Sequence, residues 1–221
     1  MSLAIFDLDN TLIAGDSDFL WGQFLVDNNI VDSEIYARSN QYFYEQYQAG
    51  TLDIHEYARF AFQPLAEHPL EALLTWRDRF MEEYIRPIML PAARDLIEGH
   101  RKKGNLLMII TATNRFITEL IAKDFGIPHL LATEPRIVDG HFVAEIEGIP
   151  CFQRGKVDRL MEWMAVHDQN LDGSWFYSDS HNDQPLLEMV DNPVAVDADK
   201  LLEKTARERG WELMSLRDNP A

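Results

Sequence analysis

Near its start, the chain carries a short apolar segment that runs directly into two carboxylates. Residues 3–6 read Leu-Ala-Ile-Phe, and Asp7 and Asp9 follow. An apolar run that ends in polar residues predicts a buried parallel strand, because such a strand is covered on both faces. Ligands of open α/β sheets bind beyond the carboxyl ends of the strands. Two neighbouring acids there repel each other unless a cation or a proton relieves them. Residues 3–6 therefore predict a central strand, and the two acids predict a ligand site beyond it.

Strands and helices alternate in the second part of the chain. Apolar runs bounded by glycine, proline and polar residues predict strands at 106–111, 129–132, 174–178 and 193–196, a hairpin of 136–138 with 142–144 around Asp139-Gly140, and helices near 92–103, 115–125, 155–167, 183–189 and 199–208. This alternation predicts a doubly wound parallel sheet. We therefore expect an α/β protein with a three-layer α/β/α, Rossmann-like arrangement.

The segment between the first and second predicted strands has a different character. It predicts four helices, near 17–28, 32–49, 53–66 and 70–86, with Asp32 and Asp53 as N-caps. Many aromatic residues lie in these helices, and we expect most of them to build the core of a small bundle. A few could instead line a substrate pocket. We expect residues 1–15 plus 88–221 to form the α/β core and residues 16–87 to form a helical cap domain.

The composition narrows the range of partners. Asp and Glu number 37 against 20 Lys and Arg, which gives a net charge of −17 and argues against binding to nucleic acid or to anionic membranes. The apolar runs are too short to span a bilayer, and we expect no signal peptide. The single cysteine, Cys151, fits a reducing compartment and a structural role. We expect a cytoplasmic monomer or homodimer.

Three later segments also place polar groups at strand ends or helix starts. Thr111 and Ala112 follow the second apolar run and precede a helix, where main-chain N–H groups and a hydroxyl can bind an anion. Lys156 opens another helix and can supply positive charge. The third long strand runs into Asp179 and Asp183. His181 lies between these two acids, and we expect it to face solvent in the loop.

These four segments, in this order, resemble the haloacid dehalogenase-like (HAD) superfamily of phosphohydrolases. The D-x-D-x-T motif of that family matches Asp7, Asp9 and Thr11, and its later motifs match Thr111, Lys156 and Ser178 to Asp183. Serines replace both glycines of the last motif. The resemblance covers the whole predicted core. The helical insert resembles, more loosely, the cap of the subgroup that contains phosphoserine phosphatase.

The resemblance implies a two-step phosphoryl transfer. Asp7 would attack phosphorus and become an aspartyl-phosphate, while Asp9 would act as the acid and then as the base. Thr111, Ala112 and Lys156 would hold the phosphate oxygens. The family also implies Mg²⁺, held by the Asp7 carboxylate, the Asp9 main-chain carbonyl and Asp179, with Asp183 in support.

The cap implies the identity of the substrate less directly. Asp16 corresponds to a family glutamate that meets the amino group of phosphoserine, and Arg59 is a candidate clamp for a substrate carboxylate by spacing, although a surface salt bridge is an alternative. We expect a small phosphorylated metabolite such as phosphoserine or histidinol phosphate. A phosphotransferase that uses the same intermediate, or a catalytically silent binding module, remains as an alternative.

Overall fold

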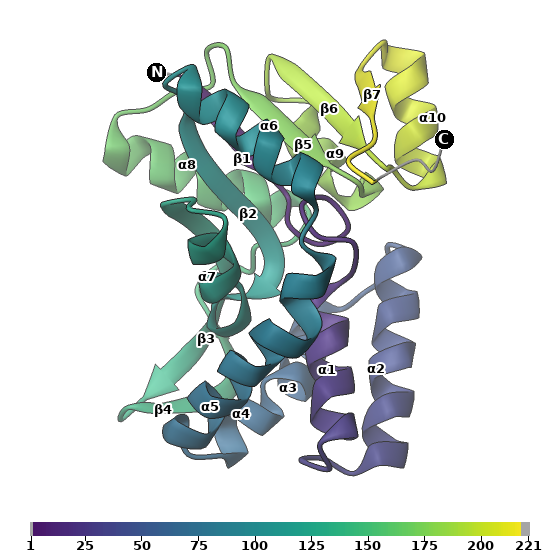
Figure 1. Ribbon diagram of the computed structural model, residues 1–221, viewed down its shortest axis with the longest axis vertical. Helices are drawn as coiled ribbons and strands as arrows, with labels where there is room; N and C mark the ends of the chain where they lie inside the picture. The colour runs from purple at the N-terminus through teal and green to yellow at the C-terminus, as the bar shows by residue number, and fades with distance from the viewer. Residues whose placement is uncertain (1, 218–221) are drawn as a thin grey trace.

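The structure is a computed structural model that describes residues 2–217, and its centre is a twisted sheet (Figure 1). Seven strands of this part of the chain lie in the order β4-β3-β2-β1-β5-β6-β7. Only β4 runs antiparallel to its neighbour. The strands are β1 (Leu3–Phe6), β2 (Leu106–Asn114), β3 (His129–Val138), β4 (His141–Glu147), β5 (Trp175–Ser178), β6 (Asn192–Val196) and β7 (Glu212–Met214). The predicted doubly wound α/β fold is confirmed.

The central strand β1 shows why its sequence is apolar throughout. Its four residues are fully buried, and their side chains alternate between two hydrophobic clusters. Ala4 and Phe6 pack toward α6 (Pro91–Lys102) and α7 (Arg115–Asp124). Leu3 and Ile5 pack toward the helices of the opposite face, which are α8 (Arg154–His167), α9 (Gln184–Leu187) and α10 (Lys200–Arg209). The molecule therefore has three layers, with the sheet between two sets of helices.

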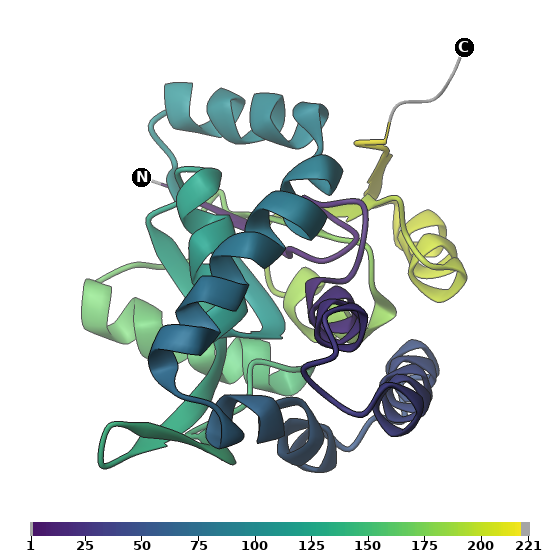
Figure 2. The ribbon, with the colours of Figure 1, turned by 60° about the horizontal axis from the view of Figure 1, so that its bottom comes forward.

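Residues 16–88 form a group of helices beyond the carboxyl ends of β1 and β2 (Figures 1 and 2). They are α1 (Ser17–Asp27), α2 (Ser33–Gln48), α3 (Ile54–Ala61), α4 (Gln63–Glu67) and α5 (Leu70–Phe80), followed by the short turns η1 (Met81–Ile85) and η2 (Arg86–Ile88). The side chains of Asp32 and Asp53 accept main-chain N–H groups at the starts of α2 and α3, as predicted. None of the helices within residues 2–217 has the length and apolar character needed to cross a membrane.

The helical insert and the sheet share one hydrophobic cluster. The ring of Trp21 in α1 lies 5.2 Å from that of Phe80 in α5 and 6.1 Å from that of Phe116 in α7. The Arg77 guanidinium stacks over Phe116 at 4.8 Å and donates to the main-chain carbonyl of that residue at 2.9 Å. These contacts attach α1 and α5 firmly to α7.

The far end of α2 meets the core through different contacts. Asn182 Nδ2 donates to the main-chain carbonyl of Tyr47 at 3.2 Å, and the ring centroids of Tyr47 and Phe152 are 6.0 Å apart. This end of the insert is thus joined to the segment after β5 by one hydrogen bond and to the segment before α8 by one ring contact.

Several predicted boundaries were wrong. The helix predicted at 53–66 is divided at Phe62 into α3 and α4, because Pro64 has no N–H to continue the hydrogen-bond ladder. The strand predicted at 129–132 continues as β3 into the hairpin, where Asp139 and Gly140 have positive φ angles of 51° and 80°. The helix predicted at 183–189 contracts to α9 after the turn η3 (His181–Asp183), and β7 was not predicted.

Candidate active site

A cavity lies at the carboxyl ends of β1 and β2, between the sheet and the helical insert. The sheet side of the cavity is lined by Asp7, Asp9, Thr111, Ala112 and Thr113. The insert supplies acids and aromatic rings, which include Asp16, Asp18, Phe43, Tyr44, Tyr47 and Tyr57. The segments after β1 and β2, which the sequence associated with phosphate chemistry, therefore line the same cavity.

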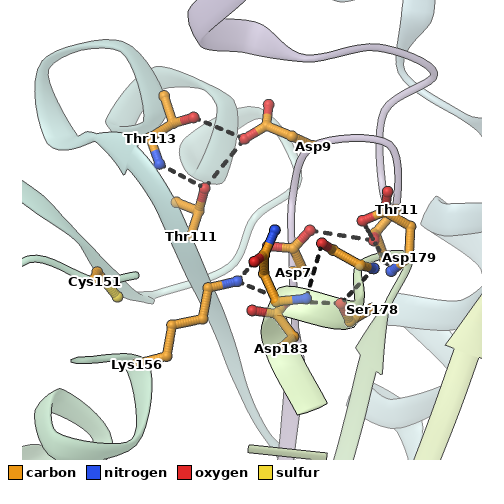
Figure 3. A network of polar contacts seen from close by, with 12 residues as sticks. Asp7, Asp9, Thr11, Thr111, Thr113, Cys151, Lys156, Ser178, Asp179 and Asp183 are labelled. Atoms are coloured by element: carbon orange, nitrogen blue, oxygen red, sulfur yellow. Dashed lines mark hydrogen bonds and ion pairs between the residues drawn. The ribbon is translucent and has the colours of Figure 1, made fainter. Parts of the chain in front are cut away.

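Lys156 joins two acids from opposite ends of the chain (Figure 3). Its Nζ donates to Asp7 Oδ1 at 2.8 Å and to Asp183 Oδ2 at 2.7 Å, and its side chain is only 3% exposed. Ser178 Oγ donates to the same oxygen of Asp183 at 2.7 Å. Burial alone would lower the pKa of Lys156, but the charges of Asp183 and Asp7 raise it, so the lysine remains a cation. A buried cation thus lies directly against the Asp7 carboxylate.

Asp7 and Asp179 lie on either side of one hydroxyl. Thr11 Oγ1 is 3.3 Å from Asp7 Oδ2 and 3.4 Å from Asp179 Oδ1, and it accepts the main-chain N–H of Asp179 at 3.1 Å. Burial raises the pKa of Asp7 to about 7, and the charges of Asp183 and Asp9 act in the same direction against Lys156. Burial, with the charges of Asp7 and Asp183, raises the pKa of Asp179 well above its usual value. These carboxylates carry more negative charge than Lys156 alone balances.

The carboxylate of Asp9 accepts hydrogen bonds from four donors. The Ser17 main-chain N–H and hydroxyl donate to Oδ1 at 2.6 and 2.5 Å. The hydroxyls of Thr111 and Thr113 donate to Oδ2 at 3.2 and 2.8 Å. The contacts of Ser17 and Thr113 with Asp9 were not predicted from the sequence. The period of a strand could have indicated Thr113, since residues two apart face the same side.

The residues expected to recognise the substrate have different positions. Asp16 caps α1 by accepting the N–H groups of Asp18 and Phe19 at 3.0 and 2.8 Å, and it also lines the cavity. Arg59 is exposed on α3 and is not among the residues that line the cavity. The structure therefore brings Asp16 to the candidate site but does not bring Arg59 there.

Two further residues near the site have structural partners. His181 is half-buried, and its Nδ1 lies 2.7 Å from Asp199 Oδ2, so the expectation of a solvent-facing residue was wrong. Cys151 is fully buried, with its Sγ 3.5 Å from the Leu131 carbonyl oxygen (Figure 3). Burial raises the pKa of the Cys151 thiol to about 12, which fits a structural role.

The donor set at the site suits a hard divalent cation. The described residues contain no cluster of three or more His, Cys, Asp or Glu side chains arranged around one point. A cation here would therefore rest on two carboxylates, Asp7 and Asp179, with main-chain oxygen and water. Mg²⁺ prefers few protein ligands, all of them oxygen, and retains several waters. The residues present fit that preference, and a bound cation would offset the uncompensated charge.

Comparisons with known proteins agree with this geometry. The profile of the haloacid dehalogenase-like hydrolase family matches residues 4–188. A histidinol-phosphatase of Neisseria meningitidis serogroup C (strain 8013) is 40% identical over 220 residues, which cover 98% of this chain and 99% of the relative.

Solved structures give the same result for the fold. The structure of a protein of unknown function from Bordetella pertussis Tohama I is 40% identical, with a TM-score of 0.92, and covers 98% of this chain and 99% of that one. A substrate-bound phosphoserine phosphatase is 15% identical with a TM-score of 0.72, covers 98% of this chain and 93% of that one, and shares the fold. The chain belongs to the haloacid dehalogenase-like hydrolase family, among its phosphatases.

Proposed function

We propose that the protein is a Mg²⁺-dependent phosphomonoester hydrolase that acts on a small phosphorylated metabolite through an aspartyl-phosphate on Asp7. The observation that supports this most is that Asp7, Asp9 and Thr111 line one end of the cavity, with the buried Lys156 cation directly against Asp7. Small alcohol phosphates such as phosphoserine and histidinol phosphate are the candidate substrates. Residues 16–87 would act as a cap that excludes bulk water from the reaction.

In the first step, the Asp7 carboxylate attacks phosphorus in line with the leaving oxygen. A P–O bond to Asp7 forms as the bond to the substrate oxygen breaks, and Asp9 donates a proton to that oxygen. In the second step, Asp9 takes a proton from the water that attacks the phosphorus, which releases inorganic phosphate and restores Asp7. Lys156 and the Thr111 hydroxyl, with the Ala112 main chain, would hold the phosphoryl oxygens.

A cation held by Asp7, the Asp9 main-chain carbonyl and Asp179 would supply charge stabilisation when bound. Asp183 would support this arrangement indirectly, because its carboxylate is occupied by Lys156 and Ser178. Thr11 keeps Asp7 and Asp179 adjacent, since its hydroxyl lies between them.

The test compares p-nitrophenyl phosphate hydrolysis by the wild type and by Asp7→Asn. We expect the wild type to release inorganic phosphate with Mg²⁺ and to lose activity with a chelator, and we expect Asp7→Asn to lose at least about a thousandfold in kcat because the nucleophile is gone. The circular dichroism of the variant should match that of the wild type. Wild-type rates in Asp7→Asn would remove Asp7 as nucleophile, and the appearance of a phosphorylated alcohol on addition of an acceptor would indicate a phosphotransferase instead.

A further inference from the structure

The cavity has a second polar region, formed by the insert and separate from the phosphoryl end. Asp18 lies in the first turn of α1 and lines the cavity together with the rings of Phe43 and Tyr57. None of the described residues that line the cavity is Lys, Arg or His. The region therefore offers negative charge and aromatic surface, without a cation of the protein to balance them.

Within the described residues, the carboxylate of Asp18 is stabilised by two side chains, those of Asn114 and Tyr57. Its Oδ1 accepts Asn114 Nδ2 at 3.2 Å, a bond at the long end of the normal range. The pKa of Asp18 is raised to about 7, chiefly by burial and also by the charge of Asp9, while the hydrogen bond from the Tyr57 hydroxyl acts to lower it. If the only role of Asp18 were to interact with the positive end of the α1 dipole, its anionic form would be stabilised and its pKa would be lowered. The position of Asp18 thus costs folding free energy, which indicates a role in the cavity.

The rings beside Asp18 form one aromatic cluster. The ring of Phe43 lies 5.4 Å from that of Tyr57 and 5.2 Å from that of Phe60, and the ring of Tyr36 lies 4.5 Å from that of Phe60. After burial, the charge of Asp18 is the next cause that raises the pKa of both Tyr36 and Tyr57. Aromatic faces beside a carboxylate attract ammonium and imidazolium groups, because both the ring quadrupole and the charge favour a cation.

We propose that Asp18, with Tyr57 and Phe43, binds a cationic group on the alcohol part of the substrate, so that the substrate is a small alcohol monophosphate carrying an ammonium or imidazolium and no carboxylate. This inference rests on the proposed function, because the phosphate must lie at Asp7. A substrate carboxylate would face Asp16 and Asp18 with no cation lining the cavity to pair with it, and such like-charge contacts disfavour binding strongly.

The test uses four compounds, and the first three differ by one group at a time. Ethyl phosphate is neutral in its alcohol part, 2-aminoethyl phosphate adds an ammonium, and L-phosphoserine adds a carboxylate to that. We expect kcat/KM for 2-aminoethyl phosphate to exceed those for ethyl phosphate and L-phosphoserine by about tenfold or more, since a charge-assisted contact is worth at least that factor. L-Histidinol phosphate, with an amine, an imidazole and no carboxylate, should be the best substrate of the set.

Asp18→Asn removes the charge and keeps the shape of the side chain. We expect it to reduce the ratio of kcat/KM for 2-aminoethyl phosphate to that for ethyl phosphate by roughly tenfold, mainly through KM. Tyr57→Phe, which keeps the ring and loses the hydroxyl, should reduce the ratio less. Glu34→Gln is the matched control, because Glu34 is an exposed acid of the insert paired with Arg38, and the ratio should not change.

The outcomes separate this inference from the proposed function. A wild type that hydrolyses p-nitrophenyl phosphate but shows equal kcat/KM for ethyl and 2-aminoethyl phosphate overturns the cation site alone. A preference for L-phosphoserine, or an Asp18→Asn variant that loses activity equally on both alkyl phosphates, overturns it as well. A wild type that hydrolyses none of these compounds overturns both proposals.

Discussion

At the scale of single residues, Asp9 is held by more donors than any other site carboxylate described above. Ser17, Thr111 and Thr113 together give its two oxygens four hydrogen bonds. A residue that gives a proton and then takes one must keep the same orientation through both steps. Thr113 and Ser17 are therefore positioning residues for Asp9 in the proposed reaction.

Removal of the Thr113 hydroxyl should slow most the reactions whose leaving group needs an acid. We expect Thr113→Val to lower kcat roughly tenfold for an alkyl phosphate and much less for p-nitrophenyl phosphate, whose leaving group needs no protonation. Steady-state kinetics on both substrates measure the difference. Thr113→Ser keeps the hydroxyl and should restore the alkyl rate, while an equal loss on both substrates would contradict a role in positioning Asp9 as the acid.

Asp18 should make the protein less stable in alkaline solution. Because burial raises its pKa to about 7, the folded state retains a proton that the unfolded chain releases above about pH 4. Its stabilising contribution is therefore complete below pH 4 and is lost as the pH rises through 7. With a chelator present, Asp18→Asn should raise the free energy of unfolding by on the order of 1–2 kcal/mol at pH 8 and by little at pH 4. The reason is that removing a buried charge at pH 8 outweighs the change in the hydrogen bond to Asn114. Thermal unfolding at both pH values measures this, and an equal gain at both would contradict a buried ionised carboxylate.

At the scale of elements, the start of α8 depends on a glycine. A Cβ on Gly155 would lie 2.0 Å from the Pro150 carbonyl oxygen, whereas a Cβ on Gly99 in α6 would contact nothing within 4 Å. The close approach at Gly155 fixes where α8 begins, and hence where Lys156 reaches Asp7 and Asp183.

Gly155→Ala should therefore disturb both the fold and the site. We expect a loss of about 1–3 kcal/mol in unfolding free energy, together with a large loss of phosphatase activity, because the backbone must shift beside Lys156. Gly99→Ala is the matched control and should stabilise the protein by about 0.5–1 kcal/mol, since alanine favours a helix. Chemical denaturation and p-nitrophenyl phosphate assays measure both. Full activity in Gly155→Ala would show that the position of α8 does not depend on this contact.

The sequence predicted elements better than it predicted their ends or their neighbours. Apolar runs indicated β1, β2, β5 and β6 because each of these strands is covered on both faces. The break at Phe62 and the length of β3 depend on contacts with distant segments, which local patterns do not contain. For the same reason Asp7 and Lys156 were recognisable from motifs, while Ser17 and Asp18 belong to no motif and could equally cap the first helix of the insert or face the pocket.

At the scale of the whole molecule, the insert and the α/β core are expected to unfold together. Phe80 is fully buried, and its ring centroid lies 5.2 Å from that of Trp21 and 5.8 Å from that of Phe24. These rings belong to a hydrophobic cluster that also contains residues of β1. Phe80→Ala should lower the free energy of unfolding by about 3–5 kcal/mol and leave one cooperative transition. Leu70→Ala, at a position that is 51% exposed in the same helix, should change little. Calorimetry measures both, and two separate transitions would contradict a shared core.

The contacts of the insert are unequal, and this bears on how a substrate would enter. Helices α1 and α5 share buried rings with α7, whereas the end of α2 is joined to the core through Asn182 and the Tyr47 ring. Opening of the cavity would therefore cost least on the α2 side.

Because Cys151 is buried, a fluorescent label can be attached elsewhere on the protein to follow movement of α2. The only thiol of the chain is 0% exposed and has a pKa raised to about 12, so maleimide reagents find almost no thiolate to attack under native conditions. Glu45→Cys, at an exposed position of α2, could then carry a single fluorophore while the native Cys151 stays in place. The protein is in this sense already prepared for site-specific labelling, and the dye would report the position of α2 during turnover.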